Sequence, residues 1–351
     1  MSAVDTSAVD MSKDWRERRV FVTGATGIVG SWLVKRLLGL GADVVTLVRD
    51  WDPQSELIRT GEIMRTRVVN GCLEDYATLE RAINDHDVDT VFHLGAQPIV
   101  TTALRSPLPT FEANIRGSYN LLEACRVHRD LVTRVVVASS DKAYGESAAL
   151  PYTEDMPANG RHPYDVSKSC TDLLALSYAH TYDAPVAVAR CGNIYGGGDL
   201  NWSRIVPGTI RSLWLGQRPV IRSDGRYTRD YIFVQDVVDA YLTLAEHCTE
   251  AGVRGEAFNF SPETRITVLE IAQLIQRLMG RPDLDPVILD QARAEIRDQH
   301  LDSSKARQRL GWRARSSIEG GLRDAIGWYE RFFDANVQRP AAESCGSPKP
   351  L

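Results

Sequence analysis

Short apolar runs alternate with longer amphipathic segments through the first half of the chain. Residues 31–40, 75–84 and 114–127 repeat their apolar positions with the period of a helix. Between them lie short runs rich in valine, which are typical of strands that are buried on both faces of a parallel sheet. These runs are 19–22, 44–48, 68–69, 89–97, 134–138 and 186–190. The alternation predicts an α/β fold with a doubly wound parallel sheet.

The pattern changes after residue 190, where strands and helices no longer alternate regularly. Helices are predicted over 205–215, 237–247 and 268–279, and short strands over 219–221, 231–234 and 257–260. This mixture predicts a smaller, mixed α/β C-terminal lobe that covers the carboxyl edge of the parallel sheet and closes a cleft. The polar residues 1–14 and 335–351 predict a disordered leader and a disordered tail.

The composition narrows the classes of partner. A net charge of −5 over 351 residues, without a dense block of Lys and Arg, argues against nucleic-acid binding. No apolar run approaches the roughly 20 residues that a membrane span needs. The six cysteines are scattered without the spacing of metal ligands, so we expect no metal and a reducing, cytoplasmic environment. The expected partners are small molecules.

Three glycines connect the first predicted strand to the first predicted helix. Gly24, Gly27 and Gly30 form a variant of the dinucleotide-binding fingerprint. Glycine permits the tight turn and lets the backbone approach a pyrophosphate at the positive end of the helix. The second strand is followed by Arg49, which suits the phosphate of NADP, and by Asp50, which suits the ribose of NAD. The pattern predicts a bound dinucleotide, NAD, and leaves NADP open.

Small residues within the fourth predicted strand, 89–97, extend this site. Gly95 and Ala96 would let a cofactor lie against the backbone. His93 precedes them inside an apolar strand, and we expect it to be structural. The residues expected to bind the cofactor are Gly24, Thr26, Gly27, Ile28, Gly30, Arg49, Leu94, Gly95, Ala96, Tyr164 and Lys168.

Polar residues at the end of the run 134–138 are placed for chemistry. Ser140, Asp141 and Lys142 follow this strand, and ligands of open α/β sheets bind outside the carboxyl ends of strands. A polar strand end that turns into a loop is the alternative. Tyr164 and Lys168 share one face of a helix, where the ammonium could lower the pKa of the phenol from about 10. The pair predicts a general base.

Arginines of the second half are candidates for phosphate binding, because the planar guanidinium donates two parallel hydrogen bonds. For each of them, a solvated or salt-bridged role is the alternative. The residues expected to bind the substrate are Gln97, Asn193, Arg204, Arg222, Arg229 and Arg297.

Taken together, these residues resemble the extended short-chain dehydrogenase/reductase family, which contains NAD-dependent epimerases and dehydratases. The resemblance covers nearly the whole folded chain. The motifs that carry it are Thr23-Gly24-x-x-Gly27-x-x-Gly30, His93-Leu94-Gly95-Ala96, Asn114, Ser140, Tyr164-x-x-x-Lys168, Asn193-x-Tyr195-Gly196, Arg229-Asp230-Tyr231-Ile232 with Asp236-Val237, and Lys305-Ala306 with Leu310-Gly311-Trp312.

Within this family, Ser140-Asp141-Lys142 and the loop 192–199 resemble nucleotide-sugar 4,6-dehydratases, especially the CDP-glucose type. The commonest dehydratases carry Asp-Glu where this chain has Asp141-Lys142, so Lys142 would have to replace the glutamate as the base. Cys72 stands where the family usually has an Asp near the adenine. These two departures are the main differences from the family pattern.

The resemblance implies an NAD(P)-dependent lyase that converts a CDP-, GDP-, UDP- or dTDP-hexose into a 4-keto-6-deoxy sugar nucleotide. Tyr164 would take the C4 hydroxyl proton, with Ser140 holding the same oxygen and Lys168 supporting Tyr164. Lys142 would remove the C5 proton, and Asp141 would protonate the leaving C6 hydroxyl. The dinucleotide would be tightly bound and recycled, and a cytoplasmic homodimer is expected.

Two alternatives remain open. A sugar-nucleotide 4-epimerase or 4-ketoreductase of the same family needs no acid and base at C5 and C6, and a regulatory protein could bind the cofactor on the same fold. The implied domains are a Rossmann domain of residues 15–190 plus 227–260 and a sugar-nucleotide-binding lobe of residues 191–226 plus 261–334.

Overall fold

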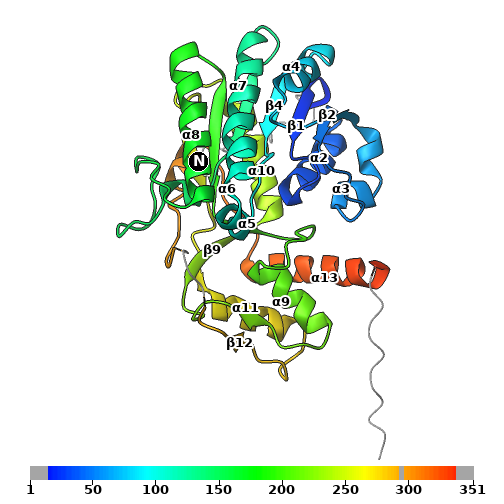
Figure 1. The fold of residues 1–351 in the computed structure, drawn as a ribbon, viewed down its shortest axis with the longest axis vertical. Coiled ribbons are helices and arrows are strands. Elements are labelled where there is room, and N and C mark those ends of the chain that lie inside the picture. Colours follow the sequence, from blue (N-terminus) through cyan, green and yellow to red (C-terminus); the bar gives the residue numbers. More distant parts are fainter. Residues whose placement is uncertain (1–14, 292–295, 337–351) are drawn as a thin grey trace, which may run out of the picture.

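A seven-stranded parallel sheet forms the larger part of the molecule (Figure 1). The computed structural model describes residues 15–291 and 296–336. The strands lie in the order β10-β6-β5-β4-β1-β2-β3, and all neighbours are parallel. Their bounds are β1 (Arg19–Thr23), β2 (Asp43–Val48), β3 (Arg67–Asn70), β4 (Thr90–His93), β5 (Arg134–Ala138), β6 (Val186–Cys191) and β10 (Ala257–Phe260). The predicted Rossmann fold with a doubly wound sheet is confirmed.

Helices cover both faces of this sheet, which explains why apolar residues are consecutive in most of its strands. Successive side chains of a strand point to opposite faces. Val20 and Val22 of β1 accordingly pack in one core, and Phe21 packs in the other. The first core is covered by α2 (Ile28–Leu40) and α10 (Val234–His247), and the second by α4 (Tyr76–Asp85), α7 (Gly117–Val127) and α8 (Pro163–Tyr182).

A smaller lobe lies beyond the carboxyl edge of the sheet, as predicted (Figure 1). It contains a three-stranded sheet in the order β11-β9-β7 and a two-stranded sheet of β12 and β8. Its elements are β7 (Asn193–Tyr195), α9 (Ile205–Trp214), β8 (Val220–Ile221), β9 (Thr228–Phe233), β11 (Arg265–Thr267), α11 (Val268–Leu278), β12 (Val287–Ile288) and α13 (Ile318–Asn336).

Strand β9 belongs to this smaller sheet, although the predicted Rossmann range 227–260 included it. Helix α10 and strand β10, which follow β9, return to the large sheet. The chain therefore crosses between the two parts within that range. The division into two domains stays a prediction.

Several short elements lie where the sequence pattern predicted none, and one of them, a π-helical turn, overlaps the start of the helix predicted over 114–127. An element of four to seven residues does not complete enough turns to show helical periodicity. These elements are α3 (Glu56–Arg59), a 3₁₀ turn (Glu62–Arg65), α5 (Val100–Arg105), α6 (Pro107–Phe111), a π-helical turn (Glu112–Arg116), a 3₁₀ turn (Asp141–Tyr144) and α12 (Ser304–Leu310).

Some predicted bounds were wrong. Strand β4 ends at His93, four residues before the predicted end at 97, because the next residues leave the sheet to line the cavity described below. The long helix α13 was not predicted, and Gly320 and Gly321 in its first turn weaken the sequence signal. The predicted leader 1–14 lies outside the described residues. So does the predicted tail, except residues 335 and 336, which end α13.

Candidate active site

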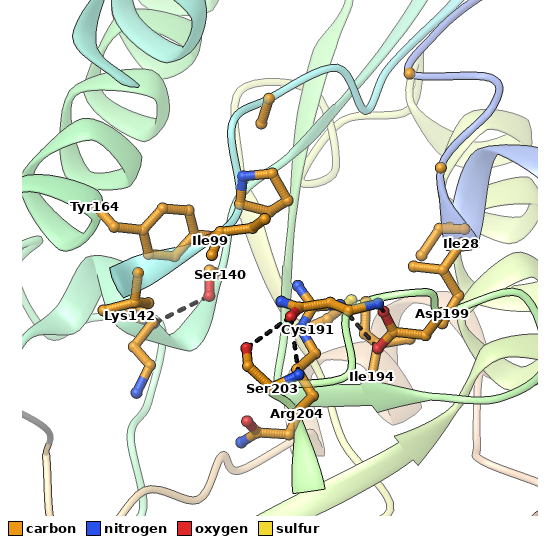
Figure 2. A pocket seen from close by; sticks show the side chains of 18 of the residues that line it. Ile28, Ile99, Ser140, Lys142, Tyr164, Cys191, Ile194, Asp199, Ser203 and Arg204 are labelled. Carbon is orange, nitrogen blue, oxygen red and sulfur yellow. Dashed lines mark hydrogen bonds and ion pairs between the residues drawn. The ribbon is translucent and has the colours of Figure 1, made fainter. Parts of the chain in front are cut away.

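A cavity of about 940 Å³ lies at the carboxyl ends of the parallel strands, against the smaller lobe. This volume is at the upper end of the range for small-molecule sites. Loops after β1, β2, β4, β5 and β6 line it, together with residues of α8 and α9. Figure 2 shows Tyr164, Ser140 and Lys142 on one side of the cavity, and Ile28 and Asp199 on the other. The five predicted catalytic residues Ser140, Asp141, Lys142, Tyr164 and Lys168 all line it.

The glycine turn after β1 forms one end of the cavity. Gly24 has a φ of +69°, and a Cβ there would lie 2.7 Å from the amide nitrogen of Gly95. A Cβ at Gly30 would lie 2.0 Å from the carbonyl oxygen of Gly24. Gly27 is the N-cap of α2, so the amides of the first helical turn have no partner within the helix. This arrangement fits a dinucleotide pyrophosphate.

All the residues predicted to bind the cofactor line this cavity. Residues Gly24 to Gly27 come from the turn before α2, and Ile28 and Gly30 come from its first turn. Arg49 follows β2, and Leu94 to Ala96 follow β4. Tyr164 and Lys168 come from α8. Cys72 also lines the cavity, at the position where the family pattern has an acid. The structure thus brings the whole predicted set together, and its binding of NAD stays a prediction for each residue.

His93 has the environment of a structural residue, as expected. Its ring nitrogens lie 2.9 Å from Thr23 Oγ1 and 2.9 Å from Ser118 Oγ. Burial lowers the pKa of His93 to about 3, so the ring is neutral at physiological pH. Thr23 Oγ1 in turn accepts a hydrogen bond of 3.0 Å from the amide of Gly95. The histidine therefore helps to fix the backbone that lines the cavity.

The turn that carries Asp141 and Lys142 begins with a cap. Ser140 Oγ accepts a hydrogen bond from the Lys142 amide at 3.2 Å and donates one to Asp141 Oδ1 at 3.0 Å. Asp141 is buried, and its other oxygen, Oδ2, has no hydrogen-bond partner among the described residues. The serine thus orients the carboxyl group toward the cavity that both residues line.

A buried polar network contacts this turn through its last residue, Tyr144. The Tyr144 hydroxyl donates to Asn259 Oδ1 at 2.7 Å and accepts from Arg190 at 2.7 Å. Arg190 makes a bidentate ion pair with Asp172 at 2.8 and 2.7 Å, with both side chains buried. Because every member is paired, the network resists displacement of the turn.

Burial dominates the pKa values of Tyr164 and Lys168. It raises the pKa of Tyr164 to about 12, although the charge of Arg204 and a hydrogen bond with Ser140 oppose the rise. It lowers the pKa of Lys168 to about 8. The Lys168 amine donates to the carbonyl oxygen of Ala138 at 2.8 Å. The lowering of the Tyr164 pKa that the sequence predicted is therefore not observed, because burial outweighs the charge of Arg204 and the hydrogen bond with Ser140.

Lys142 lines the cavity with its side chain, but its amine has a partner outside the cavity. The amine donates to Gln299 Oε1. Figure 2 shows the nitrogen turned away from Ser140 and Tyr164. This contact between residues 157 positions apart could not be predicted from the local sequence.

The predicted substrate-binding residues fall into two groups. Asn193, Arg204 and Arg222 line the cavity, and Arg204 donates to Asp199 at 3.0 Å. Gln97 and Arg297 are not among the residues that line it. The Gln97 side chain bonds the backbone of Ile99 instead, and the side chain of Arg297 is 64% exposed.

Arg229 lines the cavity, but its guanidinium group is engaged elsewhere. It donates to the backbone carbonyls of Thr228 at 2.8 Å, Ile296 at 2.6 Å and Arg297 at 2.8 Å. These bonds use three of the five guanidinium N–H donors, so fewer remain for a phosphate. Arg229 therefore has a structural role in this conformation, which the sequence reasoning missed.

Two buried carboxyl groups of the cavity were also missed. Asp165 follows Tyr164 in α8, and burial raises its pKa. Asp199 ends the glycine-rich loop after β7 and accepts the hydrogen bond from Arg204. The adjacency of Asp165 to the Tyr164-x-x-x-Lys168 motif was a usable signal in the sequence.

The described ranges 15–291 and 296–336 contain neither a candidate membrane span nor a candidate metal site. No helix there is long and apolar enough to cross a membrane. In the same residues, no cluster of three or more His, Cys, Asp or Glu side chains could hold a metal ion.

Comparison with known proteins identifies the family. The model of the "NAD dependent epimerase/dehydratase family" matches residues 20–260. The CDP-glucose 4,6-dehydratase of Salmonella typhimurium is 31% identical over 337 residues, which cover 91% of this chain and 92% of that protein. The UDP-glucose 4-epimerase of Mycolicibacterium smegmatis is 30% identical, with 89% and 98% covered.

A solved structure supports the same relationship. The UDP-glucose 4-epimerase of Thermotoga maritima, solved with UDP-glucose, has a TM-score of 0.79 and 28% identity, and the match covers 89% of this chain and 99% of that one. The relatives thus include both dehydratases and epimerases. The chain belongs to the NAD dependent epimerase/dehydratase family, as its motifs predicted, and its cofactor is NAD.

Proposed function

We propose that the chain is a nucleotide-sugar 4,6-dehydratase, which converts an NDP-hexose into an NDP-4-keto-6-deoxyhexose. The observation that carries the proposal is that Asp141 and Lys142 line the same cavity as Tyr164. Oxidation at C4 requires a base such as Tyr164. Removal of water across C5 and C6 requires a second base and an acid, and Lys142 and Asp141 have the chemistry for these roles.

The residues of the first half-reaction lie together at the end of β5. Tyr164 takes the proton of the C4 hydroxyl, and Ser140, which bonds the phenol, orients the same oxygen. Lys168 lies one helical turn from Tyr164, and its lowered pKa of about 8 lets it exchange a proton near neutral pH. Bound NAD would accept the hydride from C4 and return it to C6.

The residues of the second half-reaction are those of the capped turn. Lys142 in its neutral form removes the C5 proton, and Asp141 in its protonated form donates to the C6 oxygen as water leaves. The neighbouring Asp230 is fully buried, and burial together with the charge of Asp141 raises its pKa to about 7. Asp230 can therefore hold a proton near neutral pH, which reduces the negative charge beside Asp141.

The proposed substrate class is supported by the cavity and by the relatives. The relatives named above act on CDP-glucose and UDP-glucose by name. Arg204 and Arg222 line the cavity and offer donors for a diphosphate. We propose a CDP-, UDP-, GDP- or dTDP-hexose as substrate, with Asn193 contributing a further polar contact.

The assembly is proposed to be a homodimer. Helices α7 and α8 pack together and expose Tyr119 and Leu173, which are 41% and 57% accessible. Large apolar side chains exposed on neighbouring helices favour a second copy with the same face. Light scattering should give the mass of a dimer, and Leu173→Glu should shift it toward the monomer. The five cysteines of the described residues are free thiols, which suits a cytoplasmic location.

A 4-epimerase is the second candidate, and one contact favours it. The Lys142 amine is bound to Gln299 and turned away from Ser140 and Tyr164. An epimerase needs only Ser140, Tyr164 and Lys168, so this position of Lys142 would not matter to it. A 4-ketoreductase would use the same three residues.

The deciding experiment is to incubate the protein with CDP-, UDP-, GDP- and dTDP-hexoses and to follow product mass. A dehydratase releases water and gives a 4-keto sugar that absorbs in alkali. An epimerase product keeps the mass of the substrate. Absence of any product with the whole panel would favour a cofactor-binding regulator.

A further inference from the structure

Residues 296–302, which we name the strap, lie between strand β9 of the smaller lobe and the turn Asp141–Tyr144. The amide of Gln299 donates to the carbonyl oxygen of Thr228 in β9 at 3.2 Å. On its other side the strap forms a bridge between Leu301 and Tyr152. The backbone around Gln299 is therefore fixed by contacts on both sides.

The side chain of Gln299 contacts the amine of Lys142. Its carbonyl oxygen accepts the hydrogen bond from Lys142 Nζ, and its own Nε2 has no partner among the described residues. Gln299 is fully buried and is not among the residues that line the cavity, whereas Lys142 lines it. The glutamine thus contacts the lysine without contacting the space for the substrate.

We propose that Gln299 is a positioning residue that holds the Lys142 amine at the cavity wall and leaves it able to release a proton. This inference deepens the proposed 4,6-dehydration, in which Lys142 accepts the C5 proton, and rests on it. An amide oxygen is a neutral acceptor, so it fixes the amine without adding a negative charge that would stabilise the ammonium form. A carboxylate at the same place would stabilise that form.

Two carboxyl groups of the cavity lie close to Lys142, and the charge of the lysine acts on one of them, Asp165. Asp165 comes from α8 and Asp141 from the same turn as the lysine, and both are buried at the cavity. The charge of Lys142 lowers the pKa of Asp165, against the larger rise that burial causes. Asp230 of β9 is coupled to Asp141. Each of these carboxylates favours the protonated form of the Lys142 amine. Because the Gln299 amide is neutral, it does not add a further negative charge beside the amine.

The test uses the small number of lysines, of which the chain has six. In protein labelled with ¹³C at the lysine side chains, Lys142→Met identifies the signal of Lys142. In Gln299→Glu, whose side chain has nearly the same shape, the titration midpoint of this signal should rise by about 1 to 3 pH units, as expected for a nearby opposite charge. An unchanged midpoint in the folded variant would overturn the inference.

Asp298→Asn is the matched control, because it changes the charge of the adjacent strap residue in the opposite direction. The Asp298 side chain accepts a 2.6 Å hydrogen bond from Thr228 Oγ1, which an asparagine can also accept. The Lys142 signal should titrate in this variant as in the wild type. If the titration midpoint of Lys142 moved as far in Asp298→Asn as in Gln299→Glu, any charge in the strap would have the same effect. That result would overturn a specific role of Gln299.

Step-resolved activity is the second readout, and Gln299→Met is the second variant in case Gln299→Glu does not fold. Substrate should still reduce bound NAD in Gln299→Met, while exchange of the C5 hydrogen with solvent deuterium should fall about 10²-fold, as misplacement of a catalytic group predicts. Equal loss of both steps would show a merely structural role. If the wild type dehydrates no sugar nucleotide, the proposed function fails, whereas the ¹³C titration still decides the contact.

Discussion

Tyr164 and Lys168 respond in opposite directions to the same cause. Burial disfavours the charged form of both groups, so it raises the pKa of the phenol to about 12 and lowers that of the amine to about 8. The proton of Tyr164 is therefore held strongly and that of Lys168 weakly. Proton abstraction by Tyr164 thus depends on groups that stabilise its phenolate, such as Ser140 and Arg204.

The lowered pKa of Lys168 predicts a specific dependence of stability on pH. Its ordinary value is 10.5 and its value in the folded chain is about 8, so between these values the unfolded chain binds a proton that the folded chain does not. The free energy of unfolding should therefore rise with pH in this window, by at most about 1.4 kcal/mol per pH unit.

Lys168→Met should remove that rise. Urea unfolding of both proteins at pH 8, 9 and 10 measures the difference between them, so that groups common to both cancel. If the free energies of unfolding of the two proteins changed equally with pH, the lowered pKa could not belong to Lys168.

Asp141 and Lys142 should act after C4 oxidation and not during it. In Lys142→Met and Asp141→Asn, substrate should still reduce bound NAD, because Tyr164 and Ser140 remain. Elimination should fall by about 10² to 10⁴, the usual effect of removing a general acid or base. Lys142→Met should also lose exchange of the C5 hydrogen, which Asp141→Asn retains if deprotonation precedes loss of water.

Tyr164→Phe is the matched control for these two variants, because it should block cofactor reduction itself. The absorbance of reduced nicotinamide and the mass of the product separate the two outcomes. Dehydration by Lys142→Met within about threefold of the wild type would place its rate outside the range for a lost general base, and would contradict the assignment of Lys142 as the base at C5.

At the scale of the elements, the turn between β1 and α2 has two kinds of glycine. A side chain at Gly30 would collide with the backbone of the turn, since its Cβ would lie 2.0 Å from Gly24 O. At Gly27 the nearest atom to a Cβ would be 3.3 Å away. Gly30 is therefore required for folding of the turn. Gly27 can be substituted with less strain, so a substitution there can test cofactor binding.

Gly27→Val should fold and lose co-purifying NAD, because its bulk enters the place where the backbone meets the pyrophosphate. Gly30→Val should lose stability as well. Cofactor content after heat release and the urea midpoint measure the two effects. Unchanged NAD in Gly27→Val would contradict the predicted pyrophosphate site.

Local pattern was enough for the main elements but not for contacts between distant ones. The valine-rich runs and the 3.6-residue repeats predicted the strands of the large sheet and α2, α4 and α7, because burial on both faces leaves a strong signal. Arg229 contacts the strap about 70 residues further along the chain. Lys142 contacts Gln299 of the strap, 157 residues further along. No local period encodes such a contact.

At the scale of the whole molecule, a buried carboxylate links the first and last parts of the described chain. Glu56 of α3 accepts a 3.0 Å hydrogen bond from Trp328 of α13, and ion pairs of 2.6 Å from Lys35 and Arg59. Trp32 of α2 donates to the carbonyl oxygen of Gly197 at 2.8 Å. Helix α13 and the glycine-rich loop are thereby anchored beside the nucleotide-binding end of the large sheet.

This anchor predicts unequal effects for two neighbouring glutamates that share Lys35 as a partner. Glu56 is 4% exposed, whereas Glu62, which lies 3.2 Å from the same amine, is 27% exposed. Glu56→Ala leaves Arg59 and the indole N–H of Trp328 without this acceptor and leaves Lys35 with Glu62 alone, so it should lower the free energy of unfolding by about 3 kcal/mol. Glu62→Ala removes a more exposed pair and should lower it by about 1 kcal/mol or less. Urea unfolding at neutral pH compares the two, and equal losses would mean that the buried carboxylate does not hold α13 against α3.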